Sequence, residues 1–191
     1  MQKKELYIIG SGGLGREILS TFIHSDFVSK YQNIYFIDDS IGEISNISII
    51  GNNKYLKNLN YDVDAIIAVS NCIVRERIIN EFQNYKHVNF ITFIHPKSSI
   101  YDIDRVQIGK GCYISENSIL TTNIIIEDFC FINVNVSLHH DSIIRRNCFL
   151  MPGVRITGGA EIGENTYIGN NYQIHDKRFI QKNSILLNKY D

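Results

Sequence analysis

The sequence has no long hydrophobic run and no marked excess of either charge. No apolar stretch reaches the roughly 18 to 20 residues that a membrane span needs, and the N-terminal residues do not form a signal-peptide pattern. The chain has 19 basic and 20 acidic residues, so its charge gives no reason to expect nucleic acid or an anionic membrane as a partner. We therefore expect a cytoplasmic protein that is not inserted into a membrane.

The sequence also has few prolines and no closely paired cysteines. Only Pro96 and Pro152 are present, and no Gly/Ser-rich linker divides the 191 residues, which suffice for one large domain or two small ones. The four cysteines form no CxxC pair. We interpret them as small buried hydrophobic residues, because a reducing compartment disfavours disulfides, and we expect no bound metal.

An aliphatic residue recurs every sixth position through the C-terminal half of the chain. A period of six fits neither an amphipathic helix nor an alternating strand, and it is typical of the hexapeptide repeat of a parallel β-helix. Gly109, Gly163 and Gly169 directly follow such positions, where a sharp corner favours glycine. The periodic residues are Ile108, Ile114, Leu120, Ile126, Ile132, Leu138, Ile144, Leu150, Ile156, Ile162, Ile168, Ile174, Ile180 and Leu186.

A small or β-branched residue stands four positions after each of the first ten periodic residues, and we expect both sets to point into a narrow core. The small set is Cys112, Ser118, Ile124, Cys130, Val136, Ser142, Cys148, Val154, Ala160 and Thr166.

The sequences IGKGC at 108–112, IGENT at 162–166 and IGNN at 168–171 resemble those of the left-handed β-helix acyltransferases. In that family three hexapeptides form one triangular coil of 18 residues. Cys112, Cys130 and Cys148 follow the same spacing and should stack on one wall of the prism.

The N-terminal residues follow the pattern of a strand, a glycine-rich turn and a helix. An apolar run at 5–9 leads into GSGGLG at 10–15, and apolar residues then recur at helical spacing. A second strand at 34–37 ends at Asp38 and Asp39, near the place where a carboxylate often holds a ribose hydroxyl. A tight turn alone would explain the glycines, and a solvated strand end alone would explain the two aspartates. Their combination at this separation favours nucleotide binding.

Strands at 65–69 and 88–94 and a helix over 73–82 complete a small parallel sheet. This is one half of a Rossmann fold, and a dinucleotide normally spans two halves, so we expect a mononucleotide such as that of a sugar nucleotide. We place the domain boundary after Ile94. Residues 1–94 then form an α/β domain with a Rossmann-like parallel sheet, and residues 95–191 form an all-β left-handed parallel β-helix.

His139, His140 and Asp141 interrupt the apolar repeat. The histidines lie between the inward positions of Leu138 and Ser142, so at least one of them should point outward. Two ordinary surface histidines would also fit. However, Gly158 follows His140 by one coil and should lie beside it, leaving a backbone-lined groove in which an amide could meet a thioester oxygen.

From residue 6 to about 187 the chain resembles the bacterial sugar acetyltransferases that join a Rossmann-like sugar-nucleotide domain to a left-handed β-helix. These include UDP-4-amino-sugar N-acetyltransferases and sialic acid O-acetyltransferases. The resemblance implies a nucleotide sugar as acceptor, acetyl-CoA between neighbouring prisms of a homotrimer, His140 as catalytic base and Asp141 as its acidic partner. It also implies substrate contacts from Gly12, Gly13, Leu14, Asp38, Asp39 and Ser70, and cofactor contacts from Phe149, Gly158 and Asn170.

The chain departs from the family pattern at several positions. Leu14 stands where the family often has histidine, and Phe149 stands where a histidine can contact the cofactor. Asp141 stands where the family commonly has Glu. The terminal turn G-x-P-A-K is not found before Asp191. In the last coil, two large residues occupy positions that small residues fill in the earlier coils, namely Tyr172 and Arg178. We therefore expect this coil to be irregular.

We favour N-acetylation of a nucleotide-activated amino-deoxy sugar, with sugar O-acetylation as the closest alternative. A catalytically inactive nucleotide-binding scaffold is a further alternative, supported by Leu14 and Phe149. A nicotinamide-dependent oxidoreductase would leave half of the chain unexplained. A trimer is also expected because Ile125, Phe131 and Phe149 should point outward as an apolar surface.

Overall fold

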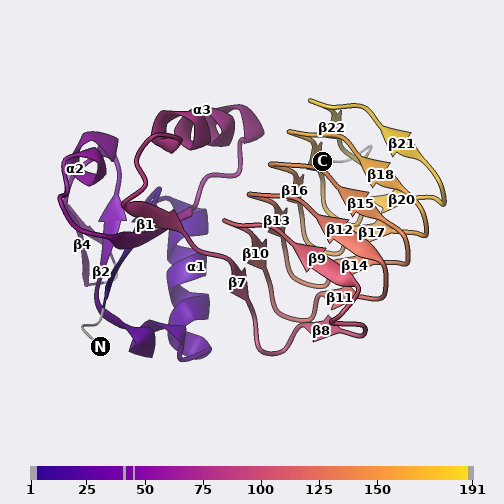
Figure 1. Cartoon of the computed structure of the whole chain (residues 1–191), viewed down its shortest axis with the longest axis horizontal. Helices are drawn as coiled ribbons and strands as arrows, with labels where there is room; N and C mark the ends of the chain where they lie inside the picture. Colours follow the sequence, from indigo (N-terminus) through magenta and orange to yellow (C-terminus); the bar gives the residue numbers. More distant parts are fainter. Residues whose placement is uncertain (1–3, 41, 45, 189–191) are drawn as a thin grey trace. The chain divides into compact units, whose positions relative to one another are not determined.

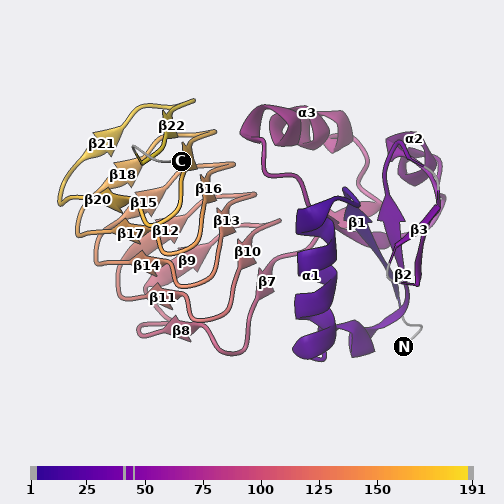
Figure 2. The same cartoon turned by 180° about the vertical axis from the view of Figure 1, so that it is seen from behind.

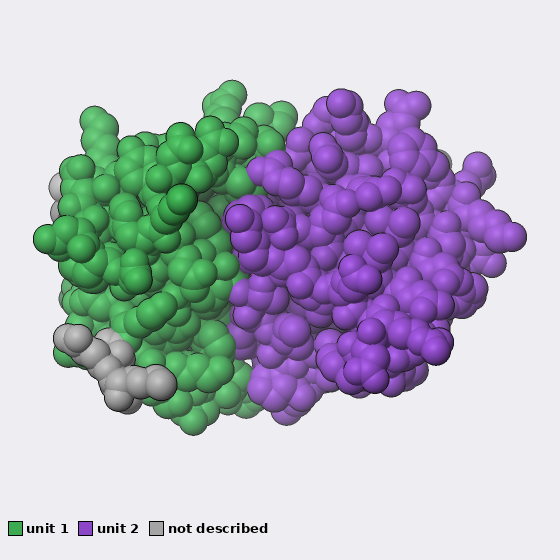
Figure 3. Space-filling model, viewed as in Figure 1, with its two compact units in different colours: residues 1–91 green, residues 92–191 purple. Residues whose placement is uncertain are grey.

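The computed structural model describes residues 4–40, 42–44 and 46–188. The chain forms two compact units, residues 1–91 and 92–191, which are coloured separately in Figure 3. The division falls after Ile91, whereas the sequence placed the boundary after Ile94. The difference arises because strand β7 (Phe93–Ile94) pairs with the β-helix strand β10 (Tyr113–Ile114).

The first unit is built on a six-stranded sheet in the order β3-β4-β2-β1-β5-β6. Its strands are parallel except β3, which is antiparallel to β4. Four strands follow the predicted pattern: β1 (Lys4–Ile9), β2 (Tyr31–Ile37), β5 (Val63–Ile67) and β6 (Val88–Phe90). The remaining elements are β3 (Gly42–Ile44), β4 (Ile47–Ile49), α1 (Gly13–His24), α2 (Asn53–Lys57), α3 (Cys72–Phe82) and the short 3₁₀-helix η1 (Phe27–Lys30).

The two main crossovers of this sheet run in opposite directions from its centre. Helix α1 connects β1 to β2 on one side of the order, and α3 connects β5 to β6 on the other. Because such crossovers are right-handed, α1 and α3 cover opposite faces of the sheet, as Figure 1 and Figure 2 show. The reversal between β1 and β5 leaves a crevice at the carboxyl ends of the strands, where ligands of this fold bind.

The sequence missed the segment between β2 and β5. The hairpin of β3 and β4 and the helix α2 are too short for hydrophobic periodicity to reveal them. The single strand predicted over 88–94 is also wrong, because β6 belongs to the sheet and β7 to the β-helix.

The second unit is a parallel β-helix whose coils stack into three flat faces (Figure 1). The first face contains β7, β10, β13 (Phe131–Ile132), β16 (Phe149–Leu150), β19 (Tyr167–Ile168) and β22 (Ile185–Leu186). The second contains β8 (Ser99–Ile100), β11 (Ile119–Leu120), β14 (Ser137–Leu138), β17 (Arg155–Ile156) and β20 (Gln173–Ile174). The third contains β9 (Val106–Ile108), β12 (Ile124–Ile126), β15 (Ile143–Ile144), β18 (Glu161–Ile162) and β21 (Phe179–Ile180).

Each strand pairs with the equivalent strand one coil away. Leu138 is opposite Ile156, and Ile144 is opposite Ile162. The predicted core is confirmed: the periodic aliphatic residues from Ile114 to Ile174 and all ten small residues are buried. Three cysteines form the expected column, with Sγ of Cys130 and Cys148 lying 3.1 and 3.2 Å from carbonyl oxygens of the following coil.

The corners are not formed as predicted. Gly109, Gly163 and Gly169 do not have positive φ. The left-handed residue lies two positions later and is usually asparagine, which tolerates this conformation. Gly109 and Gly163 are needed for a different reason, because a methyl group there would lie 2.6 and 2.5 Å from backbone nitrogens of the next coil.

The β-helix differs from the prediction at both of its ends. It begins before Ile108, with β7 and β8, and a turn at residues 101–105 interrupts the six-residue spacing there. The predicted irregularity of the last coil is wrong, since β20, β21 and β22 keep the register of the preceding strands. Arg178 is exposed and Tyr172 packs against the end of the core, so neither residue has to fit the narrow interior.

Outward aromatic residues of the first face stack on one another. The ring centroid of Phe131 lies 4.5 Å from that of Tyr113 and 4.5 Å from that of Phe149, and the interplanar angle is 7° in both pairs. Phe131 and Phe149 are only 2% and 1% exposed. The argument that these two side chains form an exposed apolar surface is therefore wrong, and Ile125 is half-buried.

None of the helices in the described residues is both long and apolar enough to cross a membrane.

The core contains a matched pair of serines from which a stability prediction follows. Ser118 and Ser142 are both 0% exposed at the small-residue position. Oγ of Ser118 lies 2.9 Å from the carbonyl oxygen of Ser115, whereas Oγ of Ser142 has no partner among the described residues. Because an unsatisfied buried hydroxyl costs about 1 to 3 kcal/mol, Ser142→Ala should raise the free energy of unfolding by about 1 kcal/mol.

Ser118→Ala is the control and should lower that free energy by about 0.5 to 1.5 kcal/mol, since it removes a satisfied hydrogen bond. Urea unfolding monitored by circular dichroism measures both changes. Equal destabilisation by the two substitutions would contradict the prediction.

Candidate functional site

The corner between β14 and β15 holds a histidine and a carboxylate in direct contact. Nδ1 of His140 lies 2.8 Å from Oδ2 of Asp141, and the two side chains are 63% and 56% exposed. An ionised carboxylate can only accept, so the proton of a neutral His140 lies on Nδ1. Nε2 is then the ring nitrogen that can take a proton from a substrate.

A third residue fixes the carboxylate. Nδ2 of Asn123, one coil earlier, donates to Oδ1 of Asp141 over 3.1 Å. The hydrogen bonds from His140 and Asn123 lower the pKa of Asp141, so its carboxylate is ionised at neutral pH. Asp141 has the left-handed corner conformation, with φ of 61°, which asparagine adopts at many other corners. Sequence analysis missed Asn123, although it precedes Asp141 by one coil.

The structure places Gly158 directly against the His140 ring, as the coil length predicts. A methyl group at Gly158 would lie 2.4 Å from Cε1 and 2.5 Å from Nε2 of His140. No side chain could occupy this position without moving the ring. The lack of a side chain at Gly158 therefore lets the His140 ring lie directly against the backbone of the next coil.

Thr157 and Asp176 complete the surroundings of His140. Interactions with Thr157, His140 and Gly158 lower the pKa of the exposed Asp176 carboxylate. The Thr157 hydroxyl itself donates to the carbonyl oxygen of Ile174 over 2.9 Å. Asp176 follows Gly158 by one coil, so the same spacing rule could have found it.

The other two predicted cofactor contacts lie elsewhere on this chain. Phe149 belongs to the aromatic stack on the first face. Asn170 is exposed at the corner between β19 and β20. The single chain therefore does not bring Phe149 or Asn170 to the corner of His140.

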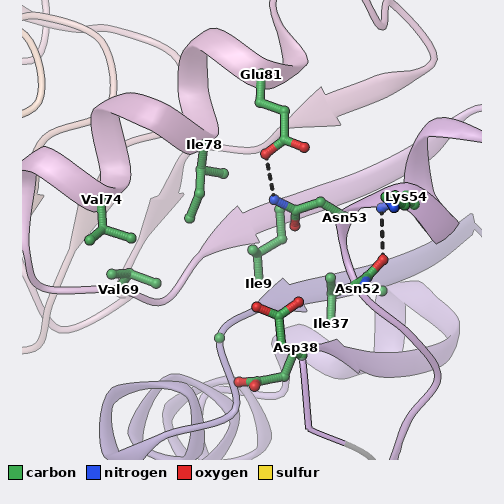
Figure 4. A pocket seen from close by; sticks show the side chains of 12 residues that line it. Ile9, Ile37, Asp38, Asn52, Asn53, Lys54, Val69, Val74, Ile78 and Glu81 are labelled. Atoms are coloured by element: carbon green, nitrogen blue, oxygen red, sulfur yellow. Dashed lines mark hydrogen bonds between the residues drawn. The ribbon is translucent and has the colours of Figure 1, made fainter.

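A second candidate site is a cavity of about 410 Å³ at the carboxyl ends of the strands in the first unit. Figure 4 shows that side chains from β1, β2, α3 and the turn before α2 surround it. Asp38 and Asp39 line it, as predicted, while Gly12, Gly13, Leu14 and Ser70 lie outside its lining. The lining residues are Ile9, Gly10, Ile37, Asp38, Asp39, Asn52, Asn53, Lys54, Val69, Val74, Ile78 and Glu81.

Asp38 is held by hydrogen bonds within the chain. Oδ2 accepts from the amide and the hydroxyl of Ser11 over 2.8 and 2.7 Å, and Oδ1 accepts from the amide and hydroxyl of Ser40 over 3.2 and 3.1 Å. Partial burial raises the pKa of Asp38, but the hydrogen bonds from Ser11 and Ser40 outweigh burial and bring it to about 2. All four acceptor positions of this carboxylate are thus used. Asp38 fixes the glycine turn, and Asp39 is the exposed carboxylate of the pair.

The glycines of the turn have separate roles. Gly10 has φ of +106°, and a methyl group at Gly15 would lie 2.1 Å from the carbonyl oxygen of Gly10. The first glycine permits the turn and the last permits α1 to pack closely on it. Gly12 is the N-cap of α1 and, like Gly13, has open space where a side chain would be.

Sequence analysis missed the polar group on the opposite side of the cavity. Nδ2 of Asn53 donates to Glu81 over 2.8 Å, and Oδ1 of Asn52 accepts from the amide of Lys54 over 3.1 Å (Figure 4). These residues begin α2, whose existence the sequence did not reveal. Among the residues that the structure describes, no cluster of three or more His, Cys, Asp or Glu is arranged to hold a metal ion.

Comparisons with known proteins match both units. Residues 5–82 match the family model of the PglD N-terminal domain, and residues 141–171 match that of the bacterial transferase hexapeptide (six repeats). A search of curated protein sequences finds no match.

Solved structures share the fold over almost the whole chain. The acetyltransferase domain of PglB from Neisseria gonorrhoeae is 22% identical, with a TM-score of 0.84 over 95% of this chain and 87% of that one. A variant of perosamine N-acetyltransferase from Caulobacter crescentus, in complex with CoA and GDP-perosamine, is 18% identical, with a TM-score of 0.81 over 95% and 84%. WeeI from Acinetobacter baumannii is 21% identical, with a TM-score of 0.71 over 96% and 92%.

The resemblance found in the sequence is therefore confirmed, as is the fold class: a small Rossmann-like α/β domain followed by a left-handed parallel β-helix of hexapeptide repeats. The β3 strand makes the N-terminal sheet mixed rather than wholly parallel.

A pH prediction follows from the hydrogen bonds of Asp38. Its folded pKa of about 2 lies below the ordinary value of 3.8, so this carboxylate stabilises the fold above pH 3.8 and loses that effect as the pH falls through 2. Ser11→Ala removes one short hydrogen bond and should raise the pKa of Asp38, as followed by NMR titration of its carboxyl carbon. Urea unfolding should show a stability deficit of this variant at pH 6 that shrinks toward pH 2.

Ser40→Ala is the matched control, because it removes a longer bond to the other, more exposed oxygen, and it should shift the pKa less. A Ser11→Ala deficit that is independent of pH would contradict the assigned cause.

Proposed function

We propose that this protein is an acetyl-CoA-dependent N-acetyltransferase that acts on a nucleotide-activated amino-deoxy sugar. The observation that carries the proposal is the His140–Asp141 pair packed against Gly158 within a hexapeptide-repeat β-helix. The similar proteins support it, since one is described as an acetyltransferase domain in complex with acetyl coenzyme A and another as a perosamine N-acetyltransferase.

In this mechanism His140 acts as a general base. An amino sugar arrives mostly as an ammonium ion, which has no lone pair for attack on the thioester carbon. Nε2 of His140 takes a proton from the attacking nitrogen, since neutral imidazole has a basicity suited to this step near neutral pH. Asp141 orients the ring through Nδ1 and stabilises the imidazolium that forms. The oxygen of the thioester then gains negative charge, which the Gly158 amide can stabilise. When the carbonyl forms again, the C–S bond breaks and CoA leaves as a thiolate, which can take the proton from the His140 imidazolium.

We further propose that the cavity of the first unit binds the nucleotide part of the acceptor. Its place at the reversal of strand order is where nucleotides bind in such sheets. Asp39 is suited to accept hydrogen bonds from ribose hydroxyls, and Asp38 acts by holding the turn at Ser11. The GDP-perosamine in the Caulobacter structure is a nucleotide sugar and supports this assignment.

Sugar O-acetylation uses the same base and remains the second candidate, because a hydroxyl also gives up a proton during attack. A catalytically inactive scaffold would not need the hydrogen bonds that link Asn123 to Asp141 and Asp141 to His140. These bonds hold an exposed imidazole in one orientation. We also propose that the protein acts in the cytoplasm, as expected from the sequence.

Replacement of the two histidines tests the catalytic assignment. Because general-base catalysis is worth about 10²- to 10⁴-fold, His140→Ala should lower kcat by about this factor and leave KM for acetyl-CoA nearly unchanged. His139→Ala is the internal control and should change kcat little. Release of CoA thiol during acetylation of UDP- and GDP-linked amino sugars measures both. A dead His139→Ala variant with an active His140→Ala variant would overturn the assignment.

We also propose a homotrimer with acetyl-CoA held between neighbouring prisms. His140 is exposed on an outer corner, and the single chain supplies neither Phe149 nor Asn170 to that corner, so a second wall for the cofactor has to come from another copy. Exposed apolar side chains remain on the β-helix, with Phe179 at 63% and Ile185 at 68%. Multi-angle light scattering at micromolar concentration should give about three times the chain mass of 22.0 kDa, and a monomer would contradict the proposal.

A further inference from the structure

Strand β5 extends further than its neighbour β6 in the sheet of the first unit. The pairing of the two strands ends at Ala65, whose carbonyl oxygen accepts from the amide of Ile91 over 3.0 Å. β5 continues to Ile67, which still pairs with Ile9 of β1 on its other side. Because alternate carbonyls of a strand point the same way, the Ile67 carbonyl points to the side where β6 has ended. A buried carbonyl in this place needs another donor.

The guanidinium of Arg75 supplies that donor. Its Nη1 donates to the carbonyl oxygens of Ile67 and Val69, each over 3.1 Å. Arg75 belongs to α3 and is only 1% exposed, although a guanidinium keeps its charge. Burying a charge is unfavourable unless hydrogen bonds compensate it, so this side chain has little freedom to leave its acceptors. Arg75 therefore ties α3 to the end of β5 and to the turn that follows it.

This tie connects two walls of the cavity in the first unit. Val69 lines the cavity from the turn after β5, while Val74, Ile78 and Glu81 line it from α3, the helix that carries Arg75 (Figure 4). Arg75 is not among the lining residues, and with 1% exposure it does not reach a ligand. It acts from behind the wall.

The turn after β5 also packs against the glycine turn. A methyl group at Gly10 would lie 2.7 Å from the carbonyl oxygen of Ala68 and 3.2 Å from Cγ2 of Val69. Gly10 lines the cavity as Val69 does, so a movement of Val69 changes two parts of the lining at once. The hydrogen bonds from Arg75 thus determine how α3, Val69 and the glycine turn are spaced.

We propose that Arg75 is a positioning residue that sets the width of this cavity by holding Val69 between α3 and the glycine turn. The inference rests on the proposed function, in which the cavity binds the nucleotide part of the acceptor. Without the two hydrogen bonds the turn after β5 has other arrangements available, and only molecules with the native arrangement bind the ligand. The apparent dissociation constant then rises in proportion to the fraction of molecules that is lost.

Calorimetric titration of the full chain with UDP and with GDP tests this role without turnover. Arg75→Met keeps the length of the side chain and removes its donors. Hydrogen bonds from a charged group correspond to a factor of about 10 to 100 in a population, so the affinity for whichever nucleotide the wild type binds should fall by about this factor. Arg75→Lys can still donate and should lose less. In turnover, KM for the amino sugar should rise likewise, while KM for acetyl-CoA and kcat at saturating acceptor stay within about twofold.

A variant in the same unit separates positioning from a general loss of stability. Phe22 of α1 is 0% exposed, its ring centroid lies 4.8 Å from that of Phe27, and it does not line the cavity. Phe22→Leu should lower the free energy of unfolding in urea and leave nucleotide affinity within about twofold. An equal loss of affinity in Phe22→Leu and Arg75→Met would overturn the inference, because destabilisation alone would then explain the effect.

A double-mutant cycle tests the route through Val69 and does not require Arg75→Met to fold. Val69→Ala removes the methyl group nearest Gly10 and should weaken nucleotide binding. Together with Arg75→Lys it should weaken binding by less than the product of the separate factors, since both act through one turn. Effects that multiply independently, or unchanged affinity in both Arg75 variants, would overturn the inference while nucleotide binding by the wild type upheld the proposed function. A wild type that binds neither UDP nor GDP would overturn the nucleotide site and this inference together.

Discussion

The pairing of each strand with the strand one coil away is the constraint on which the structure depends. It fixes residues i and i+18 in one column, so that a single choice of register decides the core, the corners and the site. The aliphatic column fills the interior, and burying each such side chain contributes roughly 1.5 to 3 kcal/mol. A shift by one residue would turn that column outward and separate His140 from Gly158.

Hydrophobic periodicity could predict the buried positions that this register controls directly. The sequence therefore located the core residues, the coil length and the approach of Gly158 to His140. It could not locate contacts made by polar side chains at corners, because these do not change the apolar pattern. Asn123 lies in the same column as Asp141, and it was missed because its side-chain hydrogen bond to that carboxylate does not change the apolar pattern.

The first unit shows the same limit in a different form. Its glycine turn and paired aspartates were visible as a motif, and both aspartates line the cavity. The motif could not show that Asp38 holds the turn while Asp39 stays exposed. The four hydrogen bonds to Asp38 come from Ser11 and Ser40, whose positions follow from the fold. The hairpin and α2 that supply Asn52 and Asn53 are too short for periodicity to detect.

The corners of the β-helix explain why a site can form on so regular a scaffold. Each corner requires a left-handed residue and leaves an amide outside the ladder, and an amide without an acceptor destabilises the fold. Where a side chain supplies the acceptor, as Asp128 does for Lys110, the corner is only structural. Where the residue is glycine, as at Gly158, an imidazole can lie directly against the backbone. The regular column of corners therefore also fixes where the His140–Asp141 pair lies relative to the next coil, and the scaffold positions this pair without any element of its own.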